Sequence, residues 1–216
     1  MENSKIGKRK LRAIETRNKI LEAARHLISK HGFENVSVDA IVEAAAVSKG
    51  AFYVHFESKD ALVAVLRDEY TNMADISYKS FIASLSEQKS VFDVLFMLAG
   101  KIADFIAEDI GYENMKMLYK AHLAKTINTM SAMSYNRKIY KLFIKVLEKG
   151  VSQGEIREDI SVESLARHLI LAVRGITFEW CIRYPEFDLK EEILDHFKIL
   201  LYGLKSSIDK TALNSF

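Results

Sequence analysis

The sequence predicts an all-α protein, and its proline usage, its lack of strand turns and its apolar spacing all point that way. One proline, Pro185, occurs in 216 residues, where average usage gives about ten or eleven. The Gly-, Asn- and Pro-rich turns that sheets require are missing, and apolar residues recur at helical spacing. The 49% hydrophobic content excludes a disordered or collagen-like chain, and the length fits one domain or two small ones.

The near-neutral net charge of +2 hides a basic N-terminal segment. Residues 1–31 carry nine basic and three acidic side chains, whereas residues 71–216 carry nineteen of each. Such a segment can attract nucleic acid or can be a solvated tail. The mean charge is therefore no evidence against a DNA partner.

Two helices are expected in the first 45 residues. Apolar side chains at a period close to 3.6 predict an amphipathic helix from about Leu11 to Lys30. Gly32 can take the left-handed conformation that ends it. Ser37 is a good N-cap for a second helix of about two turns.

A third, very short helix is expected directly after the second. The connection at 46–47 is tight, Ser48 is another N-cap, and the helix covers 49–56. Ser58 then begins a longer helix. Two short helices joined by a short turn and braced by longer helices describe a helix-turn-helix module, with the motif at about 37–56.

The third helix has the chemistry of a DNA-recognition helix. Small side chains at its start would let the backbone approach the major groove, and the polar side chains that follow can donate to phosphates or base edges. Phe52 and Phe56 have the spacing of core anchors. The capped helix starts and the basic arm would add phosphate contacts. The expected DNA contacts are Arg17, Ser37, Ser48, Lys49, Gly50, Ala51, Tyr53, His55 and Lys59.

The residues around this third helix resemble the signature of a known family. The stretch SVDAIVEAAAVSKGAFYVHFESKDALVAVL resembles the TetR/AcrR-type repressor signature, in which SxG-x-[LF]-Y-x-H-F is followed by S-K-[ED]-x-L. The preceding TRNKILEAARHLISKHGFENVSV resembles the first helix of that family. The match is strong over 16–66 and weak beyond residue 70. It implies a DNA-binding domain at 11–66 and an effector-binding and dimerisation domain at 71–210.

Two positions depart from the family pattern. The turn usually carries Gly where this chain has Ala46, and the helix before it usually carries Ala where this chain has Val42. A left-handed backbone at Ala46 would cost about 1–2 kcal/mol. The extra methyl groups of Val42 must find room beneath the recognition helix.

Start and stop signals predict further helices beyond residue 70. Pro185 is expected to end one of them near Tyr184, and Asp188 with Glu191 forms a capping box for the last one. The expected helices begin at Ser90, cover about 112–129 and 135–151 (the latter ending at Gly154), begin at the cap Ser161, and run from Asp188 to about Leu204.

The last two helices are apolar around much of their circumference and so must be buried on more than one side. The resemblance implies a homodimer through a four-helix interface built from them, and the small residues Ala172 and Gly175 would allow close approach. The alternative is that both helices are core of a monomeric bundle.

The resemblance also implies a cavity for a small organic effector. Methionine and aromatic side chains suit an adaptable apolar pocket, although each is also ordinary core. Arg174 could meet an effector carboxylate, Glu179 or an acid of the other subunit, with the salt bridge favoured. The expected ligand residues are Phe96, Phe105, Tyr119, His122, Arg174, Phe178 and Trp180.

Two further features have mainly structural interpretations. Residues 113–149 carry eight basic and two acidic side chains; a solvated face is favoured over attraction of an acidic effector such as an acyl thioester. Cys181, beside Trp180, is expected to be a buried structural thiol rather than a redox sensor.

Motifs for catalysis, metals and cofactors are missing. The sequence has no phosphate-binding glycine loop, no H-E-x-x-H, no C-x-x-C and no nucleophile elbow, so we expect no catalytic residues, metal site or cofactor. There is no secretory signal, and the most apolar stretch, 165–182, is interrupted by charges, so we expect a cytoplasmic protein without membrane contact.

The sequence therefore predicts a ligand-responsive regulator, most simply a homodimeric repressor released from a palindromic double-stranded DNA operator by a small apolar or amphipathic effector. The alternative is a helical small-molecule-binding or catalytic protein with a vestigial helix-turn-helix, an interpretation that Val42 and Ala46 favour.

Overall fold

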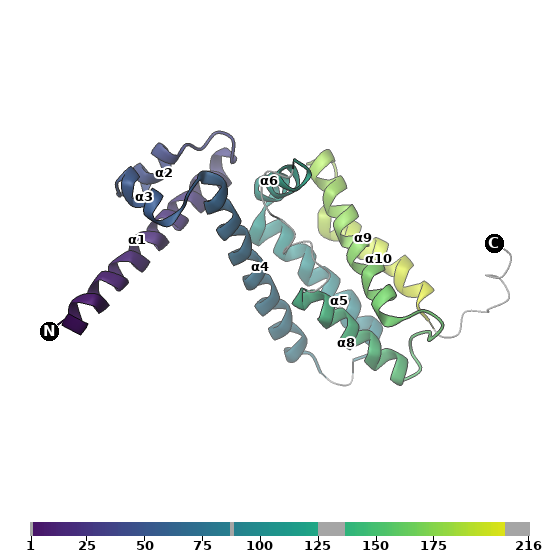
Figure 1. Ribbon diagram of the computed structural model, residues 1–216. Coiled ribbons are helices and arrows are strands. Elements are labelled where there is room, and N and C mark those ends of the chain that lie inside the picture. Colours follow the sequence, from purple (N-terminus) through teal and green to yellow (C-terminus); the bar gives the residue numbers. More distant parts are fainter. Residues whose placement is uncertain (1, 87–88, 125–136, 206–216) are drawn as a thin grey trace. The chain divides into compact units, whose positions relative to one another are not determined.

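The computed structural model describes residues 2–86, 89–124 and 137–205, and these residues fold into helices, as the sequence predicts (Figure 1). They form two compact units. The head unit contains the chain up to Thr71 together with the described segment that starts at Gly111. The body unit contains Asn72–Ile110 and the described segment that starts at Arg137.

The described residues of the head unit form four helices and the first part of a fifth. They are α1 (Glu2–His31), α2 (Val38–Ala44), α3 (Lys49–His55), the start of α4 (Lys59–Ser84), and α6 (Tyr112–Leu123). Helices α1, α2 and α3 pack on one another, and α6 packs on α1. Their shared core is formed by side chains such as Ile20, Ile28, Ile41, Phe52, Phe56 and Leu62.

The local signals for the head helices are confirmed. Gly32 has φ +77° and its amide donates to Ile28 O at 2.9 Å, which ends α1. The hydroxyl oxygens of Ser37, Ser48 and Ser58 each accept a hydrogen bond from the amide three residues later, at 3.0 to 3.1 Å. These caps satisfy amide groups that otherwise lack an intrahelical partner.

Two boundaries differ from the prediction. Helix α1 begins at Glu2 rather than near Leu11, so the basic arm is helical. Helix α4 continues to Ser84, so the division between the units lies inside a helix. The segment that starts at Gly111 belongs to the head, although the sequence assigns it to the second domain. Its place follows from the packing of α6 on α1; the functional assignment of the two predicted domains stays a prediction.

The body unit is a bundle of helices. Besides the rest of α4 it contains α5 (Val91–Asp104), the π-helix η1 (Phe105–Ile110), α8 (Lys138–Ser152), α9 (Val162–Arg183) and α10 (Leu189–Gly203). Helices α5, α8, α9 and α10 lie side by side (Figure 1), and α10 packs on both α5 and α9. The core contains Leu95, Leu98, Phe143, Leu147, Leu169, Ile193 and Phe197.

The start and stop signals of the body unit are also confirmed. Ser90, Ser161 and Asp188 accept hydrogen bonds from amides of the first turns of their helices. Helix α9 ends at Arg183, just before Pro185. The expected helix 112–129 is observed as α6 to Leu123, with Ala124 as its C-cap; residues 125–129, like the first two of the helix expected at 135–151, lie outside the described residues.

Candidate nucleic-acid interface

The short helix α3 divides its side chains sharply between core and solvent. Phe52 is fully buried and Phe56 is its buried C-cap, as the spacing predicts. On the opposite face, Tyr53 is 51% exposed and Val54 is 80% exposed, with Lys49 and Gly50 also at the surface. Helix α3 is therefore held by two phenylalanines and presents its other face outward.

The turn before α3 has the strain that its sequence predicts. Ala46 has φ +52°, the left-handed region, and it is the one such residue other than glycine in the described chain. Its amide donates to Glu43 O at 3.0 Å, and the amide of Val47 donates to Val42 O at 3.0 Å. The Val42 side chain is buried, so the head core does accommodate its extra methyl groups. Both departures from the family pattern are thus compatible with the turn.

Lys49 joins α3 to α2. Its ammonium lies 2.7 Å from Asp39 Oδ1. The hydrogen bond to this carboxylate raises the pKa of Lys49, so the side chain stays cationic. Both groups are exposed, and an exposed pair of this kind contributes little to folding. The ammonium can therefore exchange its carboxylate partner for a phosphate oxygen at little cost.

Lys59 makes contacts within the head that the sequence does not predict. Its ammonium donates to Phe33 O at 2.9 Å and to Val36 O at 3.0 Å. It also lies 4.0 Å from the centroid of the Phe33 ring. Two of its donors thus hold the connection between α1 and α2, and its predicted contact with DNA stays a prediction.

The other predicted DNA contacts lie on α3 or on the helices α1 and α2 that pack against it. The guanidinium of Arg17, on α1, lies 5.5 Å from the centroid of the Phe56 ring, which places a cation beside the end of α3. Ala51 and His55 are half-buried, and the His55 ring lies 6.4 Å from that of Phe56. Ser37 and Ser48 are exposed caps. The structure therefore brings small, polar and cationic groups to one region of the head.

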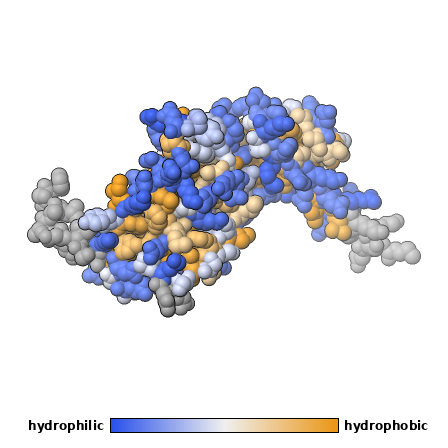
Figure 2. Space-filling view, turned by 180° about the vertical axis from the view of Figure 1, so that it is seen from behind, coloured by the Kyte–Doolittle hydropathy of each residue, from blue (hydrophilic) through white to orange (hydrophobic). Residues whose placement is uncertain are grey.

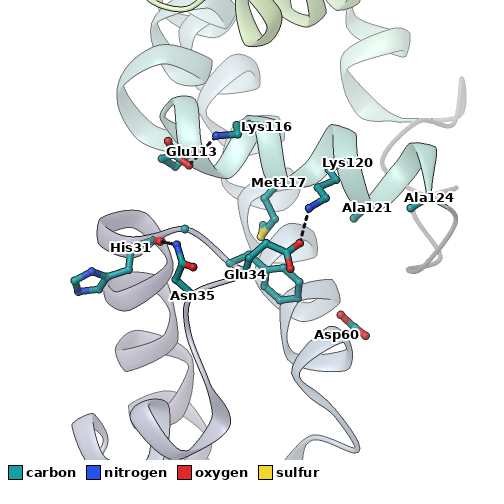
Figure 3. A pocket seen from close by; sticks show the side chains of 12 residues that line it. His31, Glu34, Asn35, Asp60, Glu113, Lys116, Met117, Lys120, Ala121 and Ala124 are labelled. Atoms are coloured by element: carbon teal, nitrogen blue, oxygen red, sulfur yellow. Dashed lines mark hydrogen bonds and ion pairs between the residues drawn. The ribbon is translucent and has the colours of Figure 1, made fainter.

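Helix α6 is a part of the head that the sequence does not reveal. The Lys120 ammonium lies 2.8 Å from Glu34 Oε1, in the connection that follows α1, and holds the pKa of Glu34 below its ordinary value. Met117 packs against the head core. These groups line a groove of about 370 Å³, together with His31, Asn35 and others (Figure 3). Sequence spacing carries no signal for a contact between residues 86 positions apart.

The seven predicted ligand residues are divided between the two units. Phe105 and Trp180 are buried in the body unit, where Phe96 and Arg174 are half-buried. Tyr119 and His122 are half-buried residues of α6, in the head unit. Phe178 is 38% exposed and faces outward from α9. The set is therefore not one cluster within a single unit.

The polar contacts of α9 differ in detail from the expected ones. Glu179 accepts a hydrogen bond from Arg183, one turn along the helix, a pairing that the sequence does not predict. Cys181 is half-buried rather than buried.

A buried polar cluster in the body unit was also not predicted. Asp75 on α4 pairs with Arg137, at the start of α8, at 3.3 Å, and its carboxylate is almost fully buried. Tyr78 lies one turn further along α4, with its ring edge-to-face on Phe105 of η1. Burial raises the pKa of the Tyr78 phenol well above its ordinary value. The two charges come from segments 62 residues apart, so sequence spacing could not pair them.

The geometry of the head defines a class of protein. Two short helices, each with a serine N-cap, are joined by a left-handed turn and braced by α1 and α4, and the second presents an exposed polar face. This is a helix-turn-helix DNA-binding unit. In the described part of the chain, no helix combines the length and apolarity needed to cross a membrane.

Comparisons with known proteins show that the chain is similar to bacterial transcriptional regulators. The model of the bacterial regulatory proteins of the tetR family matches residues 20–66. The HTH-type transcriptional repressor KstR2 of Rhodococcus jostii is 26% identical over 192 residues, which are 88% of this chain and 91% of that protein. The HTH-type transcriptional repressor BepR of Brucella suis is 25% identical, over 83% of this chain and 87% of that protein.

Solved structures share the fold. The fatty acid degradation regulator FadR of Bacillus halodurans has a TM-score of 0.68 at 20% identity and covers 88% of this chain and 97% of its own. The FadR repressor of Thermus thermophilus, in complex with lauroyl-CoA, has a TM-score of 0.66 at 21% identity over 90% of this chain and 98% of its own. The segment 20–66 is thus of the tetR type, and over most of its length the chain is similar to transcriptional regulators of that fold.

Proposed function

We propose that the protein is a homodimeric repressor that binds a palindromic operator and is released from it by a small apolar or amphipathic effector. The observation that carries the proposal is the exposed face of α3, which is free of acidic side chains and is flanked by cationic groups. The match of residues 20–66 to the tetR family model and the similarity to the repressor KstR2 support the same function.

The proposed DNA contacts follow from what each group can donate. Lys49 and Arg17 would neutralise phosphates, and the basic α1 would add attraction at longer range. Tyr53 and His55 can donate to phosphate or base edges, while Ser48, Gly50 and Ala51 are small enough for close approach. Ser37 adds a hydroxyl at the start of α2. A steep fall of affinity with salt is expected from the phosphate contacts.

The proposed dimer uses the outer faces of α9 and α10. Apolar side chains reach the surface of the body unit (orange in Figure 2). On these two helices the exposed large apolar side chains are Leu171, Phe178, Ile182, Ile199 and Tyr202. Burying them against a second copy would remove this surface from water, as an isologous interface does. A dimer would place two α3 helices about one DNA turn apart.

The proposed effector binds the body unit and is an acyl thioester of coenzyme A in the first instance. Proteins of the same fold carry such ligands, namely the Thermus thermophilus FadR with lauroyl-CoA and the Bacillus subtilis FadR with stearoyl-CoA. Their acyl tails suit an apolar helical interior, and their anionic part suits the basic side chains of α8, namely Lys138, Lys141, Lys145 and Lys149. An effector that binds better to one arrangement of the two heads would shift the population away from operator binding.

The positions of the seven predicted ligand residues decide which of them can line a site in the body unit. Phe96, Phe105, Arg174 and Trp180 stay candidates because they belong to the body interior or its margin. Tyr119 and His122 lie on α6, in the head unit, so their predicted ligand contacts are not part of the proposed body-unit site. Phe178 is reassigned to the proposed dimer surface, because its side chain points outward.

The experiment is a gel shift with the DNA upstream of the protein's own gene, followed by selection of bound duplexes from a random library. The double variant Lys49→Ala/Tyr53→Ala should lose operator retention while the dimer stays folded. Lys141→Ala, which removes an exposed lysine of α8, is the matched control and should bind as the wild type does. Unchanged binding by the double variant would sink the site assignment.

The effector is tested on the same complex. Lauroyl-CoA should release the operator in a concentration-dependent way, and free coenzyme A should not. If a series of acyl-CoA chain lengths neither releases the DNA nor binds in calorimetry, the acyl-CoA assignment is wrong while the repressor assignment stands.

A further inference from the structure

Val54 is the most exposed large apolar side chain in the described part of the chain, at 80%. It lies on α3 and is absent from the core that holds this helix. Valine is a poor helix former, because its branched side chain loses freedom in the helix. Nothing in the folding of the head therefore favours valine at this position. A lone exposed apolar residue is common on protein surfaces, so its neighbours must decide whether it has a role.

Gly50 lies one helical turn before Val54, on the same face. A Cβ added at Gly50 would meet nothing closer than Ser48 Oγ at 3.9 Å, and its backbone is not left-handed. Glycine is thus not required there by packing or by conformation, although it costs helix stability. Two residues on one face of α3, four positions apart, are therefore not explained by the fold: Gly50, where a side chain would fit, and Val54, whose apolar side chain is exposed.

The polar groups around these two residues indicate what approaches this face. Lys49 and Tyr53 border it on one side, and α3 contains no acidic residue. Because Gly50 has no side chain, the surface of a binding partner could come close to the backbone of α3 there. The same surface would then contact Val54. The flanking donors indicate that this surface carries acceptors, as the edges and phosphates of DNA do.

We propose that Val54 is a specificity-determining residue that packs on the C5-methyl group of one thymine in each operator half-site. Among the base edges in the major groove, thymine alone presents an apolar group. An isopropyl group can neither donate to nor accept from the other edges, and it would desolvate them without compensation. Val54 thereby favours thymine over cytosine, which has a hydrogen at C5. The proposal rests on the proposed operator-binding function of α3.

The expected effect is the loss of one buried methyl contact. Removing that methyl from the DNA should weaken binding about fourfold per half-site, equivalent to about 0.8 kcal/mol. Both half-sites together should give about fifteenfold, if the two contacts are independent.

The experiment uses the full chain and the duplex that it selects from a random library. Each thymine is replaced in turn by deoxyuridine, which removes only the C5-methyl group, and affinities are measured for the wild type and for Val54→Ala. The wild type should show one position per half-site that loses about fourfold. Val54→Ala should bind the thymine and uracil duplexes equally at that position. If cytosine stands at that position, 5-methylation of the cytosine should partly restore the affinity of the wild-type protein for the duplex. It should not change the affinity of Val54→Ala.

A matched control separates this contact from general effects. Leu123→Ala truncates another exposed apolar side chain of the head, 67% exposed, and should keep the wild-type uracil profile. Because Val54 is 80% exposed and alanine is a better helix former, Val54→Ala should not lower the melting temperature. Val54→Ser, which also lacks both methyl groups, should reproduce the flat uracil profile.

The outcomes distinguish the two levels of the proposal. If no duplex is selected at all, operator binding fails, and this inference fails with it. If a duplex is selected but the uracil profiles of wild type and Val54→Ala coincide, Val54 reads no methyl group and the repressor stands. A uniform loss of affinity for every duplex would also overturn the inference, because it would indicate a general contact.

Discussion

Gly50→Ala should stabilise the protein and weaken its operator binding, so the two readouts should move in opposite directions. Gly50 is the second residue of α3, and an added Cβ would lie 3.9 Å from Ser48 Oγ, an ordinary van der Waals contact. Alanine in a helix is favoured over glycine by about 0.5–1 kcal/mol. For a chain of this size, that gain raises Tm by about 1–4 °C.

The same methyl group should be harmful against DNA. It would stand on the face where close approach of the backbone is proposed, and relieving such a clash costs about 1–3 kcal/mol. Operator affinity should therefore fall by about fivefold or more. Thermal unfolding followed by circular dichroism gives the first quantity, and fluorescence anisotropy with a labelled operator gives the second.

Substitutions at two other glycines serve as controls. Gly203→Ala changes an open position of α10 and should leave operator affinity unchanged. Gly150→Ala should destabilise the body unit, because its Cβ would come within 2.5 Å of Ile156 Cγ1 and 2.9 Å of Val91 Cγ1. Wild-type operator affinity for Gly50→Ala would refute the close approach, and a lowered Tm would refute the claim that the fold does not need this glycine.

Three further outcomes are expected. Ala46→Gly should raise the free energy of unfolding by about 0.5–1 kcal/mol in urea titrations, since relief of the left-handed backbone outweighs the added entropy of the unfolded chain. Because Lys120 lowers the pKa of Glu34, their contact stabilises the head above the ordinary carboxylate pKa and is lost as pH falls; in Lys120→Ala, NMR titration should find the Glu34 pKa raised toward its ordinary value. Because burial raises the pKa of Tyr78, unfolding is favoured as pH rises above about 10, and Tyr78→Phe should lose less stability there.

Each of these has a result that contradicts it. A destabilised Ala46→Gly would mean that the methyl group is needed in the turn. An unchanged Glu34 titration in Lys120→Ala would mean that the two side chains do not pair in solution. Parallel alkaline unfolding curves for wild type and Tyr78→Phe would place that phenol in water.

The head shows how far local signals reach. The N-caps Ser37, Ser48 and Ser58 and the stop at Gly32 were predictable, because each acts through hydrogen bonds within a few residues. The strain at Ala46 was predictable for the same reason, since a tight turn restricts its own backbone. The intramolecular partners of Lys59 were not predictable, because they are carbonyls 23 and 26 residues away.

In the body unit, too, local features were predictable from the sequence and long-range contacts were not. Its helix boundaries near Ser90, Ser161 and Pro185 follow from capping and from proline, which cannot continue a helix. The sequence also indicated that α9 and α10 have more apolar surface than one core can cover. It could not indicate that Asp75 pairs with Arg137, because that contact joins segments that only packing brings together.

By itself the sequence determined the all-helical fold, the limits of most described helices and the helix-turn-helix class of the head, because each depends on local hydrogen bonding and on apolar periodicity. Only the tertiary structure decided that α6 belongs to the head, that Lys59 fastens a connection, and that Gly50 and Val54 share an open face of α3. Those properties depend on which surfaces remain after packing, and packing is a property of residues far apart in the chain.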